Sequence, residues 1–198
     1  MDYLNNLDPK RLVYTQFYCE ENIWKLCEKI HQDQPNLLKN CYVIFISNHN
    51  ESVLLWDQSL GSKNGNFVIW DYHVILVYFD RHNGIALVFD FDSILPFPCD
   101  FEKYQCSVFK AQDKLFEKYC SLFRVVDAYE YLYTFASDRT RMKNEKHEFI
   151  KPPPNYPCIR TCTEINNLNS FISMDSKSFS IGEVCTFDEF RRRFSLSQ

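Results

Sequence analysis

Several signals that would place a protein in a membrane, in the secretory pathway or on nucleic acid are missing from this 198-residue sequence. No apolar stretch is long enough to span a membrane, and the N-terminus lacks the basic and then apolar segments of a secretory signal. The longest basic run is Arg191-Arg192-Arg193 and the net charge is −4, a weak basis for binding nucleic acid. We therefore expect no membrane partner and no nucleic-acid partner.

The cysteines also lack the patterns of a disulfide scaffold or a zinc site. There are nine, an odd number scattered along the chain, and no C-x-x-C motif occurs. Cys158 and Cys162 have no second ligand pair at the spacing of a structural zinc site. We expect reduced thiols in a cytoplasmic protein that uses no metal and no other cofactor.

The composition indicates one folded domain. Hydrophobic residues make up 45% of the chain and aromatic residues 17%, which favours a real core over disorder. A chain of this length buries about 70% of the surface of its unfolded form. No internal repeat or linker divides residues 1–198, so we expect a single domain in which residues 1–13 form a loosely ordered arm.

The order of elements predicts an α+β fold. The patterns indicate a central, mostly antiparallel sheet with helices packed on both sides. The expected strands are 41–47, 53–56, 67–79, 85–91 and 123–126. The expected helices are 18–30, a segment from 128 to about 135, and a last helix after the capping box of Thr186 and Glu189. Four prolines make 151–157 an extended loop.

Cys19 lies at the predicted N-terminus of the first helix. The backbone N–H groups and the positive end of the helix dipole lower the pKa of a thiol there and provide donors for an oxyanion. Glu20 and Glu21 act in the opposite direction, because nearby negative charge raises a thiol pKa. The residue pattern alone is equally typical of a small buried cysteine.

His73 and either Asp90 or Asp92 are placed together by the geometry of the predicted hairpin. Side chains alternate along a strand, and a turn with an even number of residues puts His73 on the same face as both aspartates. Asn83-Gly84 is the expected turn signal. An ionisable pair on an apolar hairpin suits either catalysis or a structural hydrogen bond, and spacing alone does not choose between the two aspartates.

At these residues the chain resembles the protein N-terminal glutamine amidohydrolase family, from about Tyr14 to Phe194. The resemblance is carried by the segments YCEENIWKLC (18–27), VIWDYHV (68–74), FDFDSILPFPC (89–99), FASDR (135–139), PPPNYP (152–157) and NSFISM (169–174). The catalytic Cys, His and Asp of that family match Cys19, His73 and Asp90, so the resemblance favours Asp90 over Asp92.

The resemblance implies a papain/transglutaminase-like fold and a deamidase. Its expected substrates are proteins or peptides with an N-terminal glutamine, converted to glutamate through a thioester on Cys19. This step feeds the N-degron pathway, in which arginine is then added. We expect a monomer in the cytoplasm, with the nucleus as a second compartment. The alternatives are another acyl-transfer enzyme of papain fold, such as a cysteine protease or transglutaminase, and a non-catalytic module that binds N-termini.

The substrate's α-ammonium requires an acceptor near Cys19. Glu21 lies two residues from Cys19, and Asp71 lies two residues from His73 on the same face of the predicted strand. Trp70 and Tyr72 are expected to wall the pocket, and Tyr18 is a further candidate for substrate binding. Glu21 alone is as well explained as a solvated residue of the first helical turn.

Overall fold

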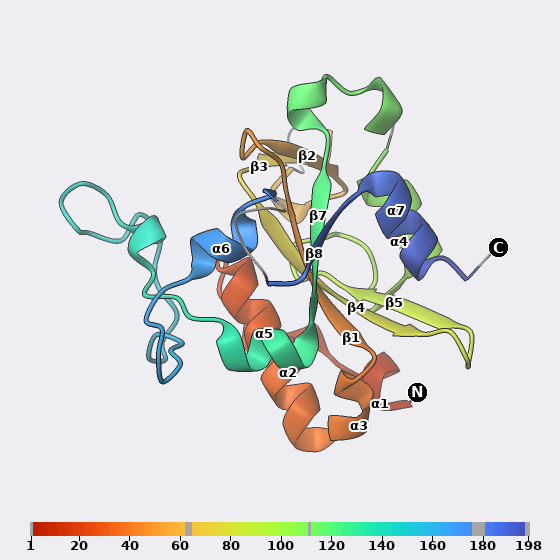
Figure 1. Ribbon diagram of the computed structural model, residues 1–198, viewed down its shortest axis with the longest axis horizontal. Helices are drawn as coiled ribbons and strands as arrows, with labels where there is room; N and C mark the ends of the chain where they lie inside the picture. Colours follow the sequence, from red (N-terminus) through yellow and green to blue (C-terminus); the bar gives the residue numbers. More distant parts are fainter. Residues whose placement is uncertain (1, 62–64, 111, 176–180, 197–198) are drawn as a thin grey trace.

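An antiparallel sheet forms the centre of the molecule (Figure 1). The computed structural model describes residues 2–61, 65–110, 112–175 and 181–196. The main sheet has six strands in the order β6-β5-β4-β1-β7-β8, and a separate pair consists of β2 and β3. The strands are Cys41–Ser47 (β1), Val53–Trp56 (β2), Phe67–Trp70 (β3), His73–Asp80 (β4), Ile85–Phe89 (β5), Cys99–Asp100 (β6), Leu122–Asp127 (β7) and Glu183–Thr186 (β8). Every strand pairing is antiparallel, which confirms the predicted kind of sheet.

The two helices with predicted capping residues begin where those residues predict. The helices are Asp2–Asn5 (α1), Cys19–Asp33 (α2), Pro35–Leu38 (α3), Phe101–Val108 (α4), Ala128–Thr134 (α5), Leu168–Ile172 (α6) and Phe187–Phe194 (α7). Asp127 caps α5 by accepting hydrogen bonds from the first-turn amides, and Thr186 forms the predicted capping box with Glu189 before α7. These local signals were sufficient because each cap satisfies backbone donors within a few residues of itself.

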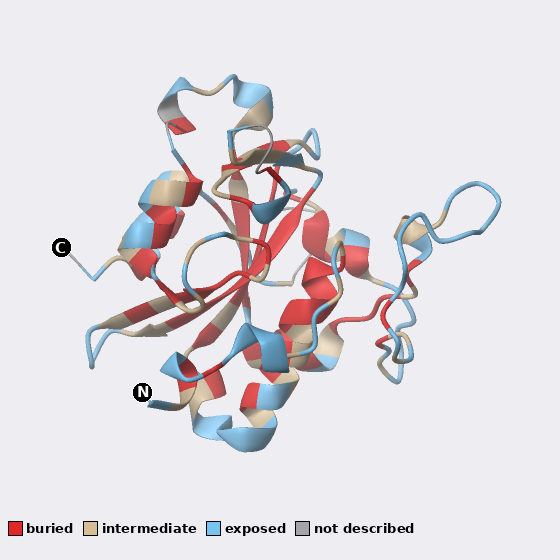
Figure 2. Ribbon diagram, turned by 180° about the vertical axis from the view of Figure 1, so that it is seen from behind, coloured by how far each residue is buried: buried red, intermediate tan, exposed pale blue. Residues whose placement is uncertain are grey.

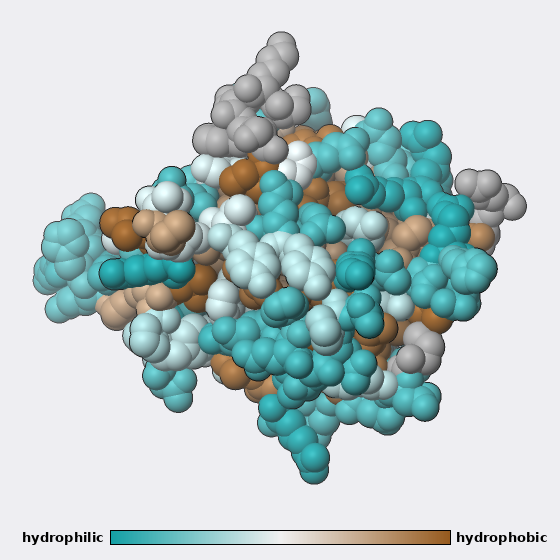
Figure 3. Space-filling view, turned by 60° about the horizontal axis from the view of Figure 1, so that its bottom comes forward, coloured by the Kyte–Doolittle hydropathy of each residue, from teal (hydrophilic) through white to brown (hydrophobic). Residues whose placement is uncertain are grey.

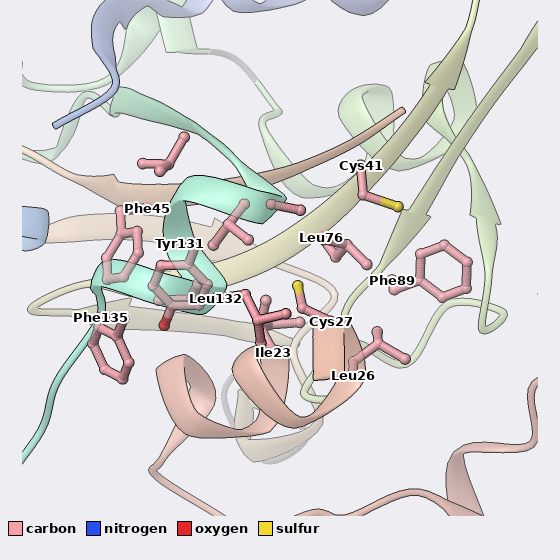
Figure 4. Close-up of a cluster of buried hydrophobic side chains, with 14 of the residues drawn as sticks. Ile23, Leu26, Cys27, Cys41, Phe45, Leu76, Phe89, Tyr131, Leu132 and Phe135 are labelled. Atoms are coloured by element: carbon pink, nitrogen blue, oxygen red, sulfur yellow. The ribbon is translucent and has the colours of Figure 1, made fainter. Parts of the chain in front are cut away.

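The sheet is covered on both faces, as predicted. Side chains on one face pack with α2, α5 and α6, and those on the other face pack with α4 and α7 (Figure 1). Figure 4 shows part of the first core, where Ile23 and Cys27 of α2 meet Leu76 of β4 and Tyr131 of α5. The alternation of β4 between two cores explains its continuous apolar sequence.

The predicted strand 67–79 is wrong as a single element. The chain bends at Asp71 and Tyr72, so that β3 pairs with β2 while β4 enters the main sheet. The hydroxyl of Ser47 donates to the Asp71 carbonyl at 2.7 Å, and the Tyr72 N–H donates to the Asp71 carboxylate at 3.0 Å. Apolar periodicity did not reveal the break because both strands consist of the same residue types.

The N-terminal arm also differs from expectation. Leu4 of α1 is fully buried and Leu7 is 7% exposed, and both belong to the core beneath α2. Tyr3 donates a hydrogen bond to Asp33 at the end of α2. The described part of the arm is therefore anchored by packing, which the short apolar positions in the sequence did not indicate.

The surface is mainly hydrophilic on the face seen in Figure 3, where apolar side chains occur in small separate groups. No helix in the described ranges is long and apolar enough to cross a membrane. Burial is concentrated on the central strands and α2, whereas the segment 144–153 is exposed and extends away from the body (Figure 2). The proline segment 151–157 contains no helix or strand, as predicted.

Candidate active site

Cys19 is the first residue of α2, as the sequence predicts. The segment before it is fastened to the helix by Asn22, whose side chain accepts from the Thr15 N–H at 2.8 Å and donates to the Thr15 carbonyl at 2.9 Å. Phe17 between them has a φ of 72°, a left-handed conformation that is uncommon for a bulky residue. This tight turn fixes the approach of the chain to the thiol.

The turn between β4 and β5 places His73 and Asp90 on one face. Asp80 pairs with Ile85, which leaves an even turn of residues 81–84, and Gly84 has the positive φ of 63° that such a turn requires. His73 Nε2 lies 2.8 Å from Asp90 Oδ1, and both side chains are buried. The prediction from strand parity is confirmed.

Two further hydrogen bonds hold Asp90, and an aromatic ring covers His73. Tyr104 of α4 donates to Asp90 Oδ2 at 2.7 Å, and the Asp92 N–H donates to Oδ1 at 3.0 Å. Trp70 stacks on the His73 ring with 5.4 Å between centroids. The carboxylate bonded to His73 is thus Asp90, while Asp92 accepts from Tyr14 at 2.7 Å. Tyr104 was missed because nothing in the sequence relates α4 to this strand end.

The pKa values of the two groups favour a charged pair. Burial by itself lowers the pKa of His73, but the charge and hydrogen bond of Asp90 outweigh burial and raise this pKa above its ordinary value. Burial by itself raises the pKa of Asp90, but His73 and the Tyr104 hydroxyl hold it below its ordinary value. His73 Nδ1 is buried without a hydrogen-bond partner among the described residues, so it remains available to exchange a proton.

Cys19 lies against the start of β4. The backbone N–H of Val74, the residue after His73, hydrogen-bonds its sulfur, and the thiol lies 3.7 Å from Glu20 Oε2. Burial first, and the Glu20 charge second, raise the pKa of Cys19 well above its ordinary value. The lowering effect of the helix position is therefore outweighed in the free protein, the opposing effect of Glu20 is confirmed, and thiolate formation requires proton transfer to a base. The structure gives no hydrogen bond between Cys19 and His73 in the described part of the chain.

Glu20 is a buried carboxylate that the sequence analysis did not single out. It is 2% exposed, and the Tyr72 hydroxyl donates to its Oε2 at 3.0 Å. Burial raises the pKa of Glu20 to about 7. Its main-chain carbonyl accepts from Tyr131 of α5 at 2.9 Å, which fixes the first turn of α2. The position of Glu20 directly after Cys19 was the sequence feature that could have indicated its place in the site.

A cavity of about 120 Å³ opens beside Cys19. Its walls include Trp70, Asp71 and Tyr72, as predicted, together with Asp92. The remaining lining residues are Phe17, Arg141 and Met142. Such a space suits a short side chain rather than a length of polypeptide, since typical ligand pockets measure roughly 300 Å³ or more.

The other predicted substrate-binding residues lie behind this cavity. Tyr18 is fully buried, and its hydroxyl donates to the Lys151 carbonyl at 3.3 Å. Glu21 is also fully buried and forms an ion pair with Arg139 at 2.7 Å, so its description as a solvated residue is wrong. Neither residue lines the cavity.

Asp71 does line the cavity, but from the bend before β4 and not from the face of a strand shared with His73. Its side chain is 53% exposed and pairs with Arg141 at 3.1 Å. Arg141 also pairs with Glu51 and lies over the Tyr72 ring. Nothing in the sequence indicated Arg141, which reaches the site from a short 3₁₀ helix, Thr140–Met142, 70 residues farther along the chain.

Arg139 connects three of the motifs that carry the family resemblance. Its guanidinium donates to both carboxylate oxygens of Glu21 and to the carbonyls of Pro154 and Tyr156. Arg139 has a φ of 62°, and its main-chain N–H is bonded to the Ser137 hydroxyl at 3.3 Å. These contacts tie the segments 135–139 and 152–157 to the first turn of α2.

His73, Asp90 and Asp92 are the one group among the described residues whose possible metal-ligand atoms all lie within 4.8 Å of one another. Their oxygens already accept hydrogen bonds from His73, Tyr104 and Tyr14. These contacts are typical of a histidine base held by one carboxylate, here Asp90, with a second carboxylate, Asp92, nearby.

This α+β protein has a thiol at a cavity, and that thiol is hydrogen-bonded by the residue that follows a buried imidazole–carboxylate pair. By class, such a site is equipped for nucleophilic chemistry. Comparison with known proteins identifies the family: the family model described as "N-terminal glutamine amidase" matches residues 14–194. The chain belongs to this family.

Relatives from distant animals support the assignment. A human protein is 45% identical over 182 residues, which cover 92% of this chain and 87% of the relative. A Drosophila melanogaster protein is 41% identical over 184 residues, covering 93% and 89%. A Danio rerio protein is 40% identical over 184 residues, covering 93% and 90%. Each of the three is named "Protein N-terminal glutamine amidohydrolase".

Proposed function

We propose that this protein hydrolyses the side-chain carboxamide of an N-terminal glutamine to give glutamate, with Cys19 as nucleophile. The observation that carries the proposal is the buried His73–Asp90 pair, which keeps His73 Nδ1 free and directly precedes Val74, the residue whose N–H bonds the Cys19 sulfur. The chain belongs to a family of amidases. The raised pKa of Cys19 makes a neighbouring base necessary, and His73 is the base that the site offers.

The reaction consists of acyl transfer to sulfur and then to water. His73 Nδ1 takes the thiol proton while Cys19 Sγ attacks the carboxamide carbon, and the oxyanion is stabilised by the Cys19 backbone N–H at the start of α2. His73 returns the proton to the nitrogen, so ammonia leaves and a γ-glutamyl thioester remains. Water then gives a proton to His73 and attacks the thioester, which releases glutamate and restores the thiol.

Asp90 and the residues around it orient the His73 imidazole and stabilise its charged form. The Asp90 carboxylate fixes the ring through Nε2 and stabilises its charged form in both half-reactions. Tyr104 keeps that carboxylate in place, and Trp70 covers the ring face. Trp70 and Asp71 form cavity walls against which the glutamine side chain lies.

The wider context is part of the same proposal. The fold is of papain/transglutaminase type, which the helix-borne Cys19 and strand-borne His73 support. The glutamate product enters the N-degron pathway, and the enzyme works as a monomer in the cytoplasm, with the nucleus as a second compartment. Its partners are proteins or peptides that begin with glutamine.

Mass spectrometry of short peptides tests the activity. A peptide that begins with glutamine should gain about one mass unit, the change from amide to acid, and release ammonia. A peptide of the same composition with internal glutamine should stay unchanged. Cleavage of either peptide would indicate a protease, and attachment of an added amine to internal glutamine would indicate a transglutaminase. Binding of the first peptide without any mass change would indicate a non-catalytic module.

A further inference from the structure

The proposed activity requires a group that recognises the α-ammonium, because this cation distinguishes an N-terminal glutamine from an internal one. Two carboxylates line the cavity beside Cys19, namely those of Asp71 and Asp92. The two carboxylates differ in burial and in hydrogen-bond partners. These differences decide which carboxylate is able to bind the substrate's α-ammonium.

Asp71 already has a cation. Arg141 lies 3.1 Å from its carboxylate, and the side chain is 53% exposed. An ammonium at Asp71 would compete with that guanidinium and with water, and an ion pair at such exposure contributes little.

Asp92 has the opposite character. It is 2% exposed and forms no ion pair among the described residues, although its carboxylate accepts a hydrogen bond from the Tyr14 hydroxyl at 2.7 Å. Burial raises the pKa of Asp92, because the free protein does not compensate its negative charge fully. A substrate ammonium placed there would supply the missing charge.

The position of Asp92 also suits the length of glutamine. Four bonds separate the carboxamide carbon from the α-nitrogen, roughly 5 Å in an extended side chain. The recognising carboxylate must therefore lie close to the catalytic groups, and a ligand atom of Asp92 lies within 4.8 Å of His73 and Asp90.

Aromatic residues lie near Asp92 in the structure and in the sequence. Tyr14 stacks on Phe91 with 5.8 Å between centroids, and Phe17 contributes to the cavity wall. Both Tyr14 and Phe17 precede α2, and Phe17 is held in a left-handed turn. A chain continuing beyond the α-nitrogen would meet these rings, and its amide would leave Asp92 without a cation.

We propose that Asp92 is the specificity-determining residue that binds the α-ammonium of the substrate's N-terminal glutamine. The proposal rests on the proposed deamidation and adds the basis of its selectivity. Tyr14 orients the carboxylate through its hydroxyl, and Asp90 remains the partner of His73.

A pair of peptides and a pair of variants test the assignment. One peptide begins with glutamine, and the other carries a 4-carbamoylbutanoyl group at the same place, which keeps the carboxamide but lacks the α-ammonium. The wild-type protein should prefer the first by about 10- to 100-fold in kcat/KM, the size of one charge-assisted hydrogen bond. Asp92→Asn should reduce that preference to within a few-fold, mainly through a higher KM for the glutamine peptide.

Asp71→Asn is the matched control, because it removes a cavity carboxylate that already has a partner, and the preference should persist. The proposal is overturned if Asp92→Asn keeps the wild-type preference or if Asp71→Asn loses it. If circular dichroism finds Asp92→Asn unfolded, Asp92→Ser replaces it as the variant without the carboxylate. Asp92→Glu then shows the effect of moving the carboxylate while its charge is kept. Absence of ammonia release by the wild-type protein would instead refute the deamidase function itself.

Discussion

Two buried charge pairs flank the N-terminus of α2. They differ in whether every nitrogen atom of the pair has a hydrogen-bond partner. His73 and Asp90 meet at 2.8 Å, and Arg139 and Glu21 meet at 2.7 Å, all with side chains at most 5% exposed. Arg139 uses its remaining donors on the carbonyls of the proline loop. His73 instead keeps Nδ1 without a partner in the described structure.

This difference separates a structural pair from a candidate catalytic one. A buried ion pair with every donor satisfied restrains the segments that supply it, whereas a buried nitrogen without a partner is retained at a cost unless it has another use. Burial and short distance are common to both pairs, so neither identifies the active site. The active site is identified by the unsatisfied nitrogen of His73, because the next residue, Val74, hydrogen-bonds the Cys19 thiol.

The largest effect on turnover is expected from removing the Cys19 thiol, for which His73 is the proposed base. Cys19→Ala should lower kcat by about 10⁵-fold or more, because no other nucleophile is placed in the cavity. Ammonia release from a glutamine-initiated peptide measures this, with thermal melting as the control for folding. A variant with near-normal turnover would remove Cys19 from the mechanism, and His73→Ala should resemble Cys19→Ala.

Breaking the catalytic pair is expected to come next. Asp90→Asn should lower kcat by about 10³- to 10⁴-fold, because the amide does not stabilise the charged imidazole. Asp92→Asn should change kcat far less, since Asp92 does not bond His73 and its expected effect is on KM. Steady-state kinetics of both variants distinguishes the carboxylates, and the reverse order would assign the His73 partner to the wrong aspartate.

Breaking the structural pair should reduce stability rather than chemistry. Arg139→Ala leaves Glu21 buried without a cation, which should cost about 3–5 kcal/mol of unfolding free energy in urea titration. The double variant Glu21→Met with Arg139→Met should lose less than the single variant, because no uncompensated charge remains. If Arg139→Ala left stability unchanged while kcat fell sharply, Arg139 would belong to the chemistry.

The pH dependence of activity should reflect the raised pKa of His73. Below that pKa the ring carries its proton and does not accept another, so kcat/KM should fall by up to about tenfold per pH unit on an acid limb above pH 6.5. Glu20, with a pKa of about 7, also titrates in this range. A rate profile of Glu20→Gln separates the two, and a wild-type limb well below pH 6.5 would contradict the assignment.

The smallest effect is expected at Cys27, which is fully buried in the core beneath the sheet (Figure 4). Cys27→Ala should lower the unfolding free energy by about 1 kcal/mol through lost packing and leave kcat unchanged. Urea unfolding and ammonia release on the same preparation check both statements. A large loss of turnover at unchanged stability would place a second thiol in the mechanism.

Local features were predictable because their causes lie within a few residues. The helix at Cys19, the cap at Asp127 and the box at Thr186 each follow from nearby side chains and orphan amides. The His73–Asp90 face followed from strand parity and an even turn. The break between β3 and β4 did not, since both halves have the same residue pattern.

Partners from distant segments could not be predicted in this way. Tyr104 reaches Asp90 from a helix on the other side of the hairpin, and Arg141 reaches Asp71 from a short 3₁₀ helix. The sequence position of Glu21 is typical of a solvated residue in the first turn of a helix. In the folded protein Glu21 is buried and forms an ion pair with Arg139, which comes from a distant segment. Burial also raised the pKa of Cys19 where the helix position alone predicted the opposite.

By itself the sequence determined the class of fold, the helix position of Cys19 and the strand face that His73 shares with Asp90 and Asp92, because hydrophobic period, capping and strand alternation act over short distances. The choice of Asp90 came from the family motifs. The tertiary structure decided which carboxylates are solvated, which are paired, and which one lines the cavity without an ion pair. Those properties depend on what packs around each group, since desolvation and charge act through space and not along the chain.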